Sequence, residues 1–166
     1  MKEKDMPFTL EEQVVSILQK RGFHISFAES CTGGLCSARL VDVPSASTVF
    51  DAGIVTYANE AKIKYLGVRP ESIESYGVVS EAVAGEMAAG VAKAQKAQVG
   101  VGVSGIAGPG GGSKEKPVGM VCFGFSVDGR VTTATRQFGD IGRNKVREAS
   151  VEFVYETLLR LLEENK

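Results

Sequence analysis

The segment FHISFAESCTGG, residues 23–34, joins an apolar stretch to a polar turn, and the fold can be worked out from it. Residues 23–28 alternate and are rich in apolar side chains, which predicts a β-strand. The polar turn follows at once and begins with Glu29 and Ser30. In α/β proteins, ligands bind at the carboxyl ends of the strands. We therefore expect this junction to belong to a functional site.

The rest of the chain alternates between helical and extended patterns. Thr9 and Glu12 have the spacing of a capping box at the start of a first helix, which Gly22 ends. Further helices are expected at residues 35–41, 59–67, 80–97 and 142–163, and further strands at residues 49–57, 98–104, 118–127 and 130–138. The Asp-Gly pair at 128–129 is a strong hairpin signal. We expect an α/β fold, a single-domain three-layer sandwich with a mixed sheet over residues 1–166.

The composition excludes several classes of protein. The 19 basic and 20 acidic residues give a net charge of -1 with no basic block, which argues against nucleic acid or an anionic membrane surface as a partner. The longest uncharged stretch, residues 97–113, is too short and too glycine-rich to span a bilayer. Residues 1–7 lack the apolar core of a signal peptide, which favours a cytoplasmic location. Three cysteines without a CxxC pair and a single histidine, His24, argue against a disulfide framework and a metal site.

Familiar motifs are present but lack the context that each one needs. Gly100, Gly102 and Gly105 match the dinucleotide pattern GxGxxG, yet the first two lie within an expected strand and no helix follows. A phosphate-binding P-loop needs a lysine and a hydroxyl residue directly after its second glycine, but Gly110 is followed by Gly111 and Gly112, so that motif is excluded. Ser113 and Lys116 have SxxK spacing, but they lie in a loop that we expect to be solvated.

A serine and a lysine remain as the best candidates for chemistry. Ser30, Tyr57 and Ser104 each end or follow an expected strand, which would bring them to one rim of the sheet. A serine nucleophile needs a base, and without a suitable histidine the available group is a lysine whose pKa is lowered by burial. Lys62, in the first turn of its helix, is that candidate, whereas Cys31 is expected to be a buried thiol. The alternative is that these serines are turn or cap residues.

Several motifs together carry a family resemblance. They are AESCTGG at residues 28–34, VTYANEAK at 55–62, GVVSE at 77–81, SGIAGP at 104–109 and KPVG at 116–119. In this order they resemble the CinA C-terminal domain family over nearly the whole chain. The resemblance implies a nicotinamide-nucleotide amidase, which hydrolyses nicotinamide mononucleotide to nicotinate mononucleotide and ammonia. It implies a serine and a lysine at the site, with no metal or cofactor.

The resemblance also assigns roles to individual residues. Ser30 would be the nucleophile and Lys62 the base. The residues expected to line the pocket and bind substrate are Thr32, Ser47, Tyr57, Ser104 and Gly105, the last two offering a hydroxyl and backbone N–H groups. Arg143, at the start of the last helix, would bind the phosphate, because a guanidinium beside a helix N-terminus suits an anion. The alternative for Arg143 is an exposed residue at a helix start.

The chain departs from the family pattern at two positions, and alternative functions stay open. Ala58 stands where the family usually has serine, and Ser104 stands where threonine is common. One alternative is a nucleotide-binding module of the same family that has lost catalysis, and another is hydrolysis of a different small carboxamide. The family resemblance also implies self-association. Longer relatives carry a separate N-terminal domain, whose activities are not transferred to this chain.

Overall fold

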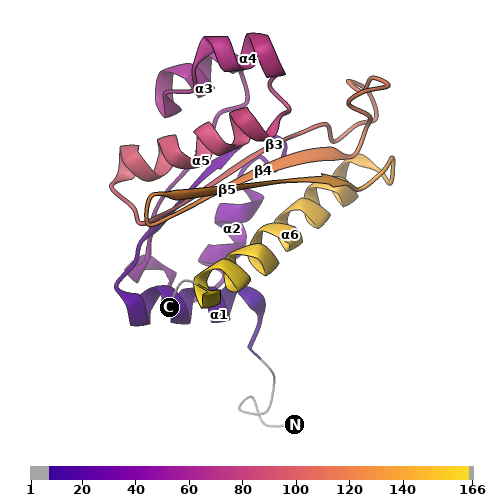
Figure 1. Cartoon of the computed structure of the whole chain (residues 1–166). Helices are drawn as coiled ribbons and strands as arrows, with labels where there is room; N and C mark the ends of the chain where they lie inside the picture. Colours follow the sequence, from indigo (N-terminus) through magenta and orange to yellow (C-terminus); the bar gives the residue numbers. More distant parts are fainter. Residues whose placement is uncertain (1–7, 165–166) are drawn as a thin grey trace.

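A five-stranded mixed sheet forms the centre of the computed structural model, which describes residues 8–164 (Figure 1). The strands are β1 (Ile25–Glu29), β2 (Phe50–Val55), β3 (Val99–Gly105), β4 (Met120–Val127) and β5 (Arg130–Gln137). Their spatial order is β2-β1-β3-β4-β5. β1 runs parallel to β2 and β3, whereas β4 is antiparallel to β3 and β5. The expected mixed sheet is confirmed.

Helices cover both faces of the sheet and complete three layers (Figure 1). One face carries α1 (Leu10–Arg21), α2 (Leu35–Val41) and α6 (Arg143–Glu164), and the other carries α3 (Asn59–Leu66), α4 (Pro70–Tyr76) and α5 (Glu81–Gln95). A short 3₁₀ turn, Ala46–Thr48, precedes β2. The expected α/β sandwich is therefore confirmed, and the carboxyl ends of its three parallel strands, β1, β2 and β3, lie at one edge.

Local signals explain where most helices begin and end. Thr9 and Glu12 form the complete capping box of α1, and Gly22 ends that helix in the left-handed conformation with φ 63°. No sequence pattern predicted helix α4. Its seven residues bury only Ser72, so it has no apolar face that a periodicity could reveal. Pro70 at its first position and Glu71 in its first turn are the local indications of its start.

Helix α5 packs closely on the sheet because glycines face it. A Cβ atom on Gly100 would lie 2.2 Å from the Ala88 carbonyl oxygen, and one on Gly102 would lie 2.4 Å from the Ala84 carbonyl oxygen. Any side chain at these positions would push the helix away from β3. The first two glycines of the GxGxxG pattern thus allow close helix–sheet packing and do not form a dinucleotide loop.

We expect the substitution Gly102→Ala to lower the free energy of unfolding by about 1–3 kcal/mol, because the added methyl overpacks the α5–sheet contact. Urea unfolding followed by circular dichroism measures the change. Gly110→Ala is the control, since no atom lies within 4 Å of a Cβ built there. Equal stability of the two variants would contradict the packing explanation.

Candidate active site

A cavity of about 450 Å³ opens at the carboxyl ends of β1, β2 and β3. Its walls come from the turn after β1, the connection from β2 to α3, the α4–α5 connection, the loop after β3 and the start of α6. Five segments that are distant in sequence therefore meet at the carboxyl edge of the sheet, where the site was expected. Of the residues that were assigned to the site, Ser30, Tyr57, Lys62, Ser104, Gly105 and Arg143 line this cavity.

Ser30 and Lys62 are in direct contact at the base of the site. The Lys62 Nζ lies 3.2 Å from Ser30 Oγ, and it donates hydrogen bonds to the carbonyl oxygens of Thr56 at 2.6 Å and Tyr57 at 3.3 Å. The Lys62 side chain is only 1% exposed. A neutral lysine amine has two N–H donors and one lone pair, so it can donate to both carbonyls while it accepts the Ser30 hydroxyl proton. This geometry allows proton transfer from serine to lysine.

Burial lowers the pKa of Lys62 below its usual value of 10.5, because desolvation disfavours the ammonium form. Among residues 8–164, no carboxylate forms an ion pair with Lys62. A Cys31 thiolate would favour the ammonium form, but burial raises the pKa of the Cys31 thiol to about 11. The thiol is therefore protonated near neutral pH, and Lys62 has no stabilising anion beside it.

Glu29, the carboxylate next to Ser30 in sequence, is fully buried and binds the start of α2. It accepts hydrogen bonds from the Cys36 N–H at 2.8 Å, the Ser37 N–H at 3.1 Å and the Ser37 hydroxyl at 2.7 Å. Gly34, at the N-cap of α2, has no side chain to cap the helix. Glu29 supplies that cap from the end of β1 and so ties both sides of the Ser30 turn together.

Arg147, on α6, holds the Ser30 turn, a role that no sequence pattern predicted. Its Nε donates to the Cys31 carbonyl at 2.9 Å, and its Nη2 donates to the Thr32 carbonyl at 3.2 Å. Its Nη1 donates to Asn144 Oδ1 at 3.1 Å, which fixes the guanidinium on the helix. No local sequence signal joins Arg147 to a turn that lies more than a hundred residues earlier.

Tyr57 and Arg143 meet at the mouth of the cavity. Arg143 Nη2 donates to the Tyr57 hydroxyl at 3.1 Å, and Nη1 donates to the Gly108 carbonyl at 2.7 Å. Tyr57 is 63% exposed. Arg143 is thus positioned by two neutral acceptors and has no carboxylate partner among residues 8–164.

Two residues that were expected to line the pocket lie elsewhere. Thr32 is fully buried and is absent from the cavity wall. Ser47 is exposed in the 3₁₀ turn Ala46–Thr48, before β2 begins, so it lies at the opposite end of that strand from Tyr57. The family resemblance that assigned Ser47 to the pocket did not indicate which end of the strand this residue would occupy.

The loop that carries Ser113 and Lys116 is also more ordered than expected. The Ser113 hydroxyl accepts from the Lys116 backbone N–H at 3.0 Å, so these residues form a closed turn and not a serine–lysine dyad. The Lys116 ammonium group reaches back to the carbonyls of Tyr76 and Val79. The expectation of solvated lysines is therefore wrong for Lys116.

Over residues 8–164, the structure contains no group of three or more His, Cys, Asp and Glu side chains that could hold a metal ion. None of the helices in the same range is long and apolar enough to cross a membrane.

We expect Glu29→Gln to lower the free energy of unfolding by about 1–3 kcal/mol, because an amide cannot accept all the hydrogen bonds that this buried carboxylate accepts. Urea titration at neutral pH measures the loss. Glu148→Gln, on the exposed side of α6, is the matched control and should leave the unfolding midpoint unchanged. If Glu29→Gln were equally neutral, the capping role of Glu29 would be refuted.

Comparison with known proteins gives a consistent result. The model of the CinA C-terminal domain family matches residues 8–162. A putative competence-damage inducible protein of Alkaliphilus oremlandii is 47% identical over 152 residues, and a CinA-like protein of Kosmotoga olearia is 47% identical over 154 residues. These alignments cover 92% and 93% of this chain but only 37% of each relative, so the chain spans little more than a third of their length.

Two solved structures of relatives superpose on this chain over almost their whole length. The competence/damage inducible protein CihA of Agrobacterium tumefaciens is 41% identical with a TM-score of 0.88, and the alignment covers 94% of this chain and 97% of that one. A CinA superfamily protein of Klebsiella pneumoniae is 34% identical with a TM-score of 0.89, covering 93% and 96%. By sequence and by structure, this chain belongs to the CinA C-terminal domain family.

Proposed function

We propose that this chain hydrolyses the carboxamide of nicotinamide mononucleotide to nicotinate mononucleotide and ammonia. The observation that carries the proposal is the 3.2 Å contact between Lys62 Nζ and Ser30 Oγ inside a cavity. A serine becomes nucleophilic when a neighbouring base takes its proton, and a buried lysine is such a base. The volume of about 450 Å³ suits a small ligand such as a mononucleotide.

The charge of the cavity supports an anionic substrate. Besides the Lys62 base, the cationic side chains of Lys116 and Arg143 line it, and no Asp or Glu from residues 8–164 does. The whole chain carries a net charge of only -1, so this positive character is local. A phosphate is the anionic part of a mononucleotide, and Arg143, with a forked guanidinium at the mouth, is the group that we assign to it.

Acyl transfer follows from the positions of the two groups. Neutral Lys62 takes the proton from Ser30 Oγ, and the oxygen attacks the carboxamide carbon. The Lys62 ammonium then protonates the leaving nitrogen, so ammonia departs and an ester to Ser30 remains. Lys62 next takes a proton from water, and the resulting hydroxide attacks the ester carbon. The bond from the acyl carbon to Ser30 Oγ breaks, the Lys62 ammonium returns the proton to that oxygen, and the acid product loses its proton to solvent and leaves as the carboxylate. The carbonyls of Thr56 and Tyr57 hold Nζ in place through both steps.

The oxyanion of the tetrahedral intermediate needs a hydrogen-bond donor beside Ser30. Two N–H groups hold the turn together: the Ser30 N–H donates to the Val103 carbonyl, and the Gly33 N–H donates to the Ser30 carbonyl. The Cys31 N–H takes part in none of these bonds, and Cys31 lines the cavity. We assign this N–H to the oxyanion. Arg147, which holds the Cys31 carbonyl, is then a positioning residue for the turn.

We expect Ser30→Ala and Lys62→Met each to lower kcat/KM for ammonia release from nicotinamide mononucleotide by at least about 100-fold, because each removes one half of the proton-transfer pair. Matched controls are Ser45→Ala and Lys64→Met, which change an exposed serine and an exposed lysine. Rapid turnover by either site variant would refute the assignment. Tight nucleotide binding without turnover by the unmodified protein would favour a non-catalytic binding module.

The lowered pKa of Lys62 also predicts how activity changes with pH. Below this pKa the neutral fraction of the base falls about tenfold for each pH unit, so kcat/KM should rise with pH and level off at a pH below 10.5. Initial rates across the alkaline range test this. Lys62→Arg should stay inactive at every pH, because a guanidinium is not deprotonated in proteins. A kcat/KM that falls as pH rises over the same range would contradict a lysine base.

A further inference from the structure

One wall of the cavity is formed by residues 77–79, an irregular segment that follows directly after Tyr76, the last residue of α4. Side chains bind the carbonyl group of Tyr76 and those of all three wall residues. Lys116 Nζ donates to the carbonyls of Tyr76 and Val79, the latter at 2.7 Å. The Gly77 carbonyl accepts from the Ser80 hydroxyl at 2.8 Å, and the Val78 carbonyl accepts from the Ser104 hydroxyl at 2.8 Å. This wall therefore has a fixed shape, and Lys116 is the cation that joins it to the loop after β3.

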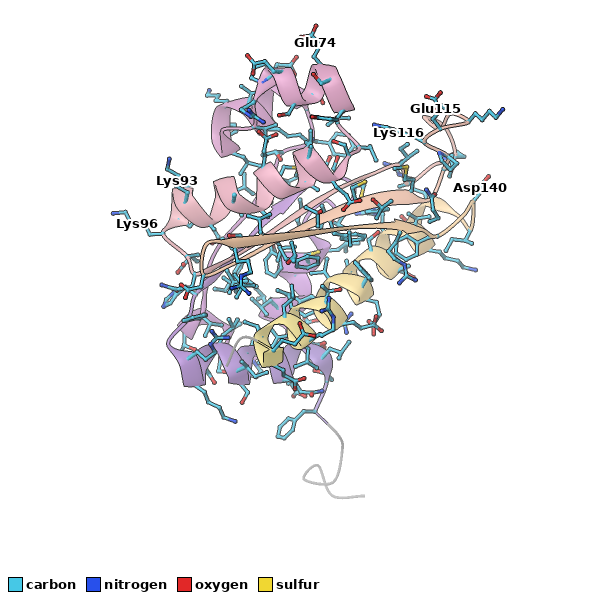
Figure 2. The ribbon with its side chains drawn as sticks, viewed as in Figure 1. Glu74, Lys93, Lys96, Glu115, Lys116 and Asp140 are labelled. Carbon is cyan, nitrogen blue, oxygen red and sulfur yellow. The ribbon has the colours of Figure 1, made fainter. Side chains whose placement is uncertain are left out.

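Lys116 is placed by several features of its surroundings. The turn from Ser113 to Lys116 is closed by hydrogen bonds in both directions, at 3.0 Å and 2.8 Å. A Cβ atom on Gly77 would lie 2.6 Å from Lys116 Nζ, so only glycine lets the ammonium approach the wall without a shift. In Figure 2 the Lys116 side chain extends from the loop toward α4, while Glu115 projects from the tip of the loop.

The hydrogen bonds of Lys116 leave one donor free. An ammonium has three N–H groups, and the Tyr76 and Val79 carbonyls accept two of them. Lys116 lines the cavity, is half-buried, and has no carboxylate partner among residues 8–164. A partly desolvated cation without a counter-ion gains more from binding an anion than an exposed lysine does.

We propose that Lys116 is an anion-binding residue of this cavity and gives its third N–H to the phosphate of the substrate. The inference rests on the proposed function, which assigns only Arg143 to that phosphate. Lys116 and Arg143 carry two formal positive charges on the cavity wall, and a phosphate monoester carries close to two negative charges at neutral pH. Lys62 is then free to act as the neutral base.

A comparison of two substrates with and without the phosphate tests this role. For Lys116→Met, we expect kcat/KM for nicotinamide mononucleotide to fall at least about 10-fold more than for nicotinamide riboside, mainly through KM. Lys114→Met, an exposed lysine of the same loop that does not line the cavity, is the matched control and should change neither value. If Lys116 only fastened the loop, both substrates would lose the same factor, and that result would overturn the proposal.

Direct binding separates this proposal from the proposed function. Calorimetry on proteins that carry Ser30→Ala measures the affinities for nicotinamide mononucleotide and nicotinamide riboside without turnover. A selective loss of mononucleotide affinity in the Lys116→Met double variant supports the anion site even if the unmodified protein releases no ammonia. Equal losses for both ligands, or no binding of either mononucleotide or inorganic phosphate to the Ser30→Ala protein, would overturn it.

Discussion

The contact between Lys62 and Ser30 depends on the register of two parallel strands. β1 and β2 pair up to Glu29 opposite Val55, and the Thr56 N–H then donates to the Glu29 carbonyl at 2.9 Å. Ser30 and Thr56 therefore leave the sheet side by side. Since Lys62 Nζ is held on the Thr56 carbonyl, it also reaches Ser30 Oγ. A slip of one residue in this register would move the serine to the other face of the sheet and separate the pair.

Side chains from one face of the sheet hold the Ser30 turn in place, whereas the lysine that contacts Ser30 comes from the other face. Glu29 caps α2 and Arg147 reaches from α6, and both helices lie on the same face (Figure 1). Lys62 comes from α3 on the opposite face. The groups that fix the turn are thus separate from the group that exchanges a proton with Ser30. This division allows the nucleophile to be rigid while the base keeps a low-polarity environment.

The parts of the structure that follow from local sequence could be predicted, and the parts that follow from distant contacts could not. Helix α2 has the expected bounds, and Ser30, Tyr57 and Ser104 lie at strand ends as their position after apolar runs indicated. Lys116 was misread because its acceptors lie 37 and 40 residues earlier in the chain. Ser104 lines the cavity as expected, but the sequence did not indicate that its hydroxyl also donates to the Val78 carbonyl. Pairing of this kind leaves no periodic pattern in a sequence.

The cavity is positive because the nearby carboxylates accept hydrogen bonds from other groups, and not because the chain has an excess of basic residues. Glu29 is engaged by backbone and hydroxyl donors of α2, and Glu81, at the start of α5, accepts from the Thr133 and Thr135 hydroxyls of β5 at 2.7 Å and 2.9 Å. Both acids are held by neutral donors, so neither neutralises a lysine or arginine of the cavity. A chain with nearly balanced charge can in this way present cations alone to a small anionic ligand, and can keep Lys62 without the carboxylate partner that would raise its pKa.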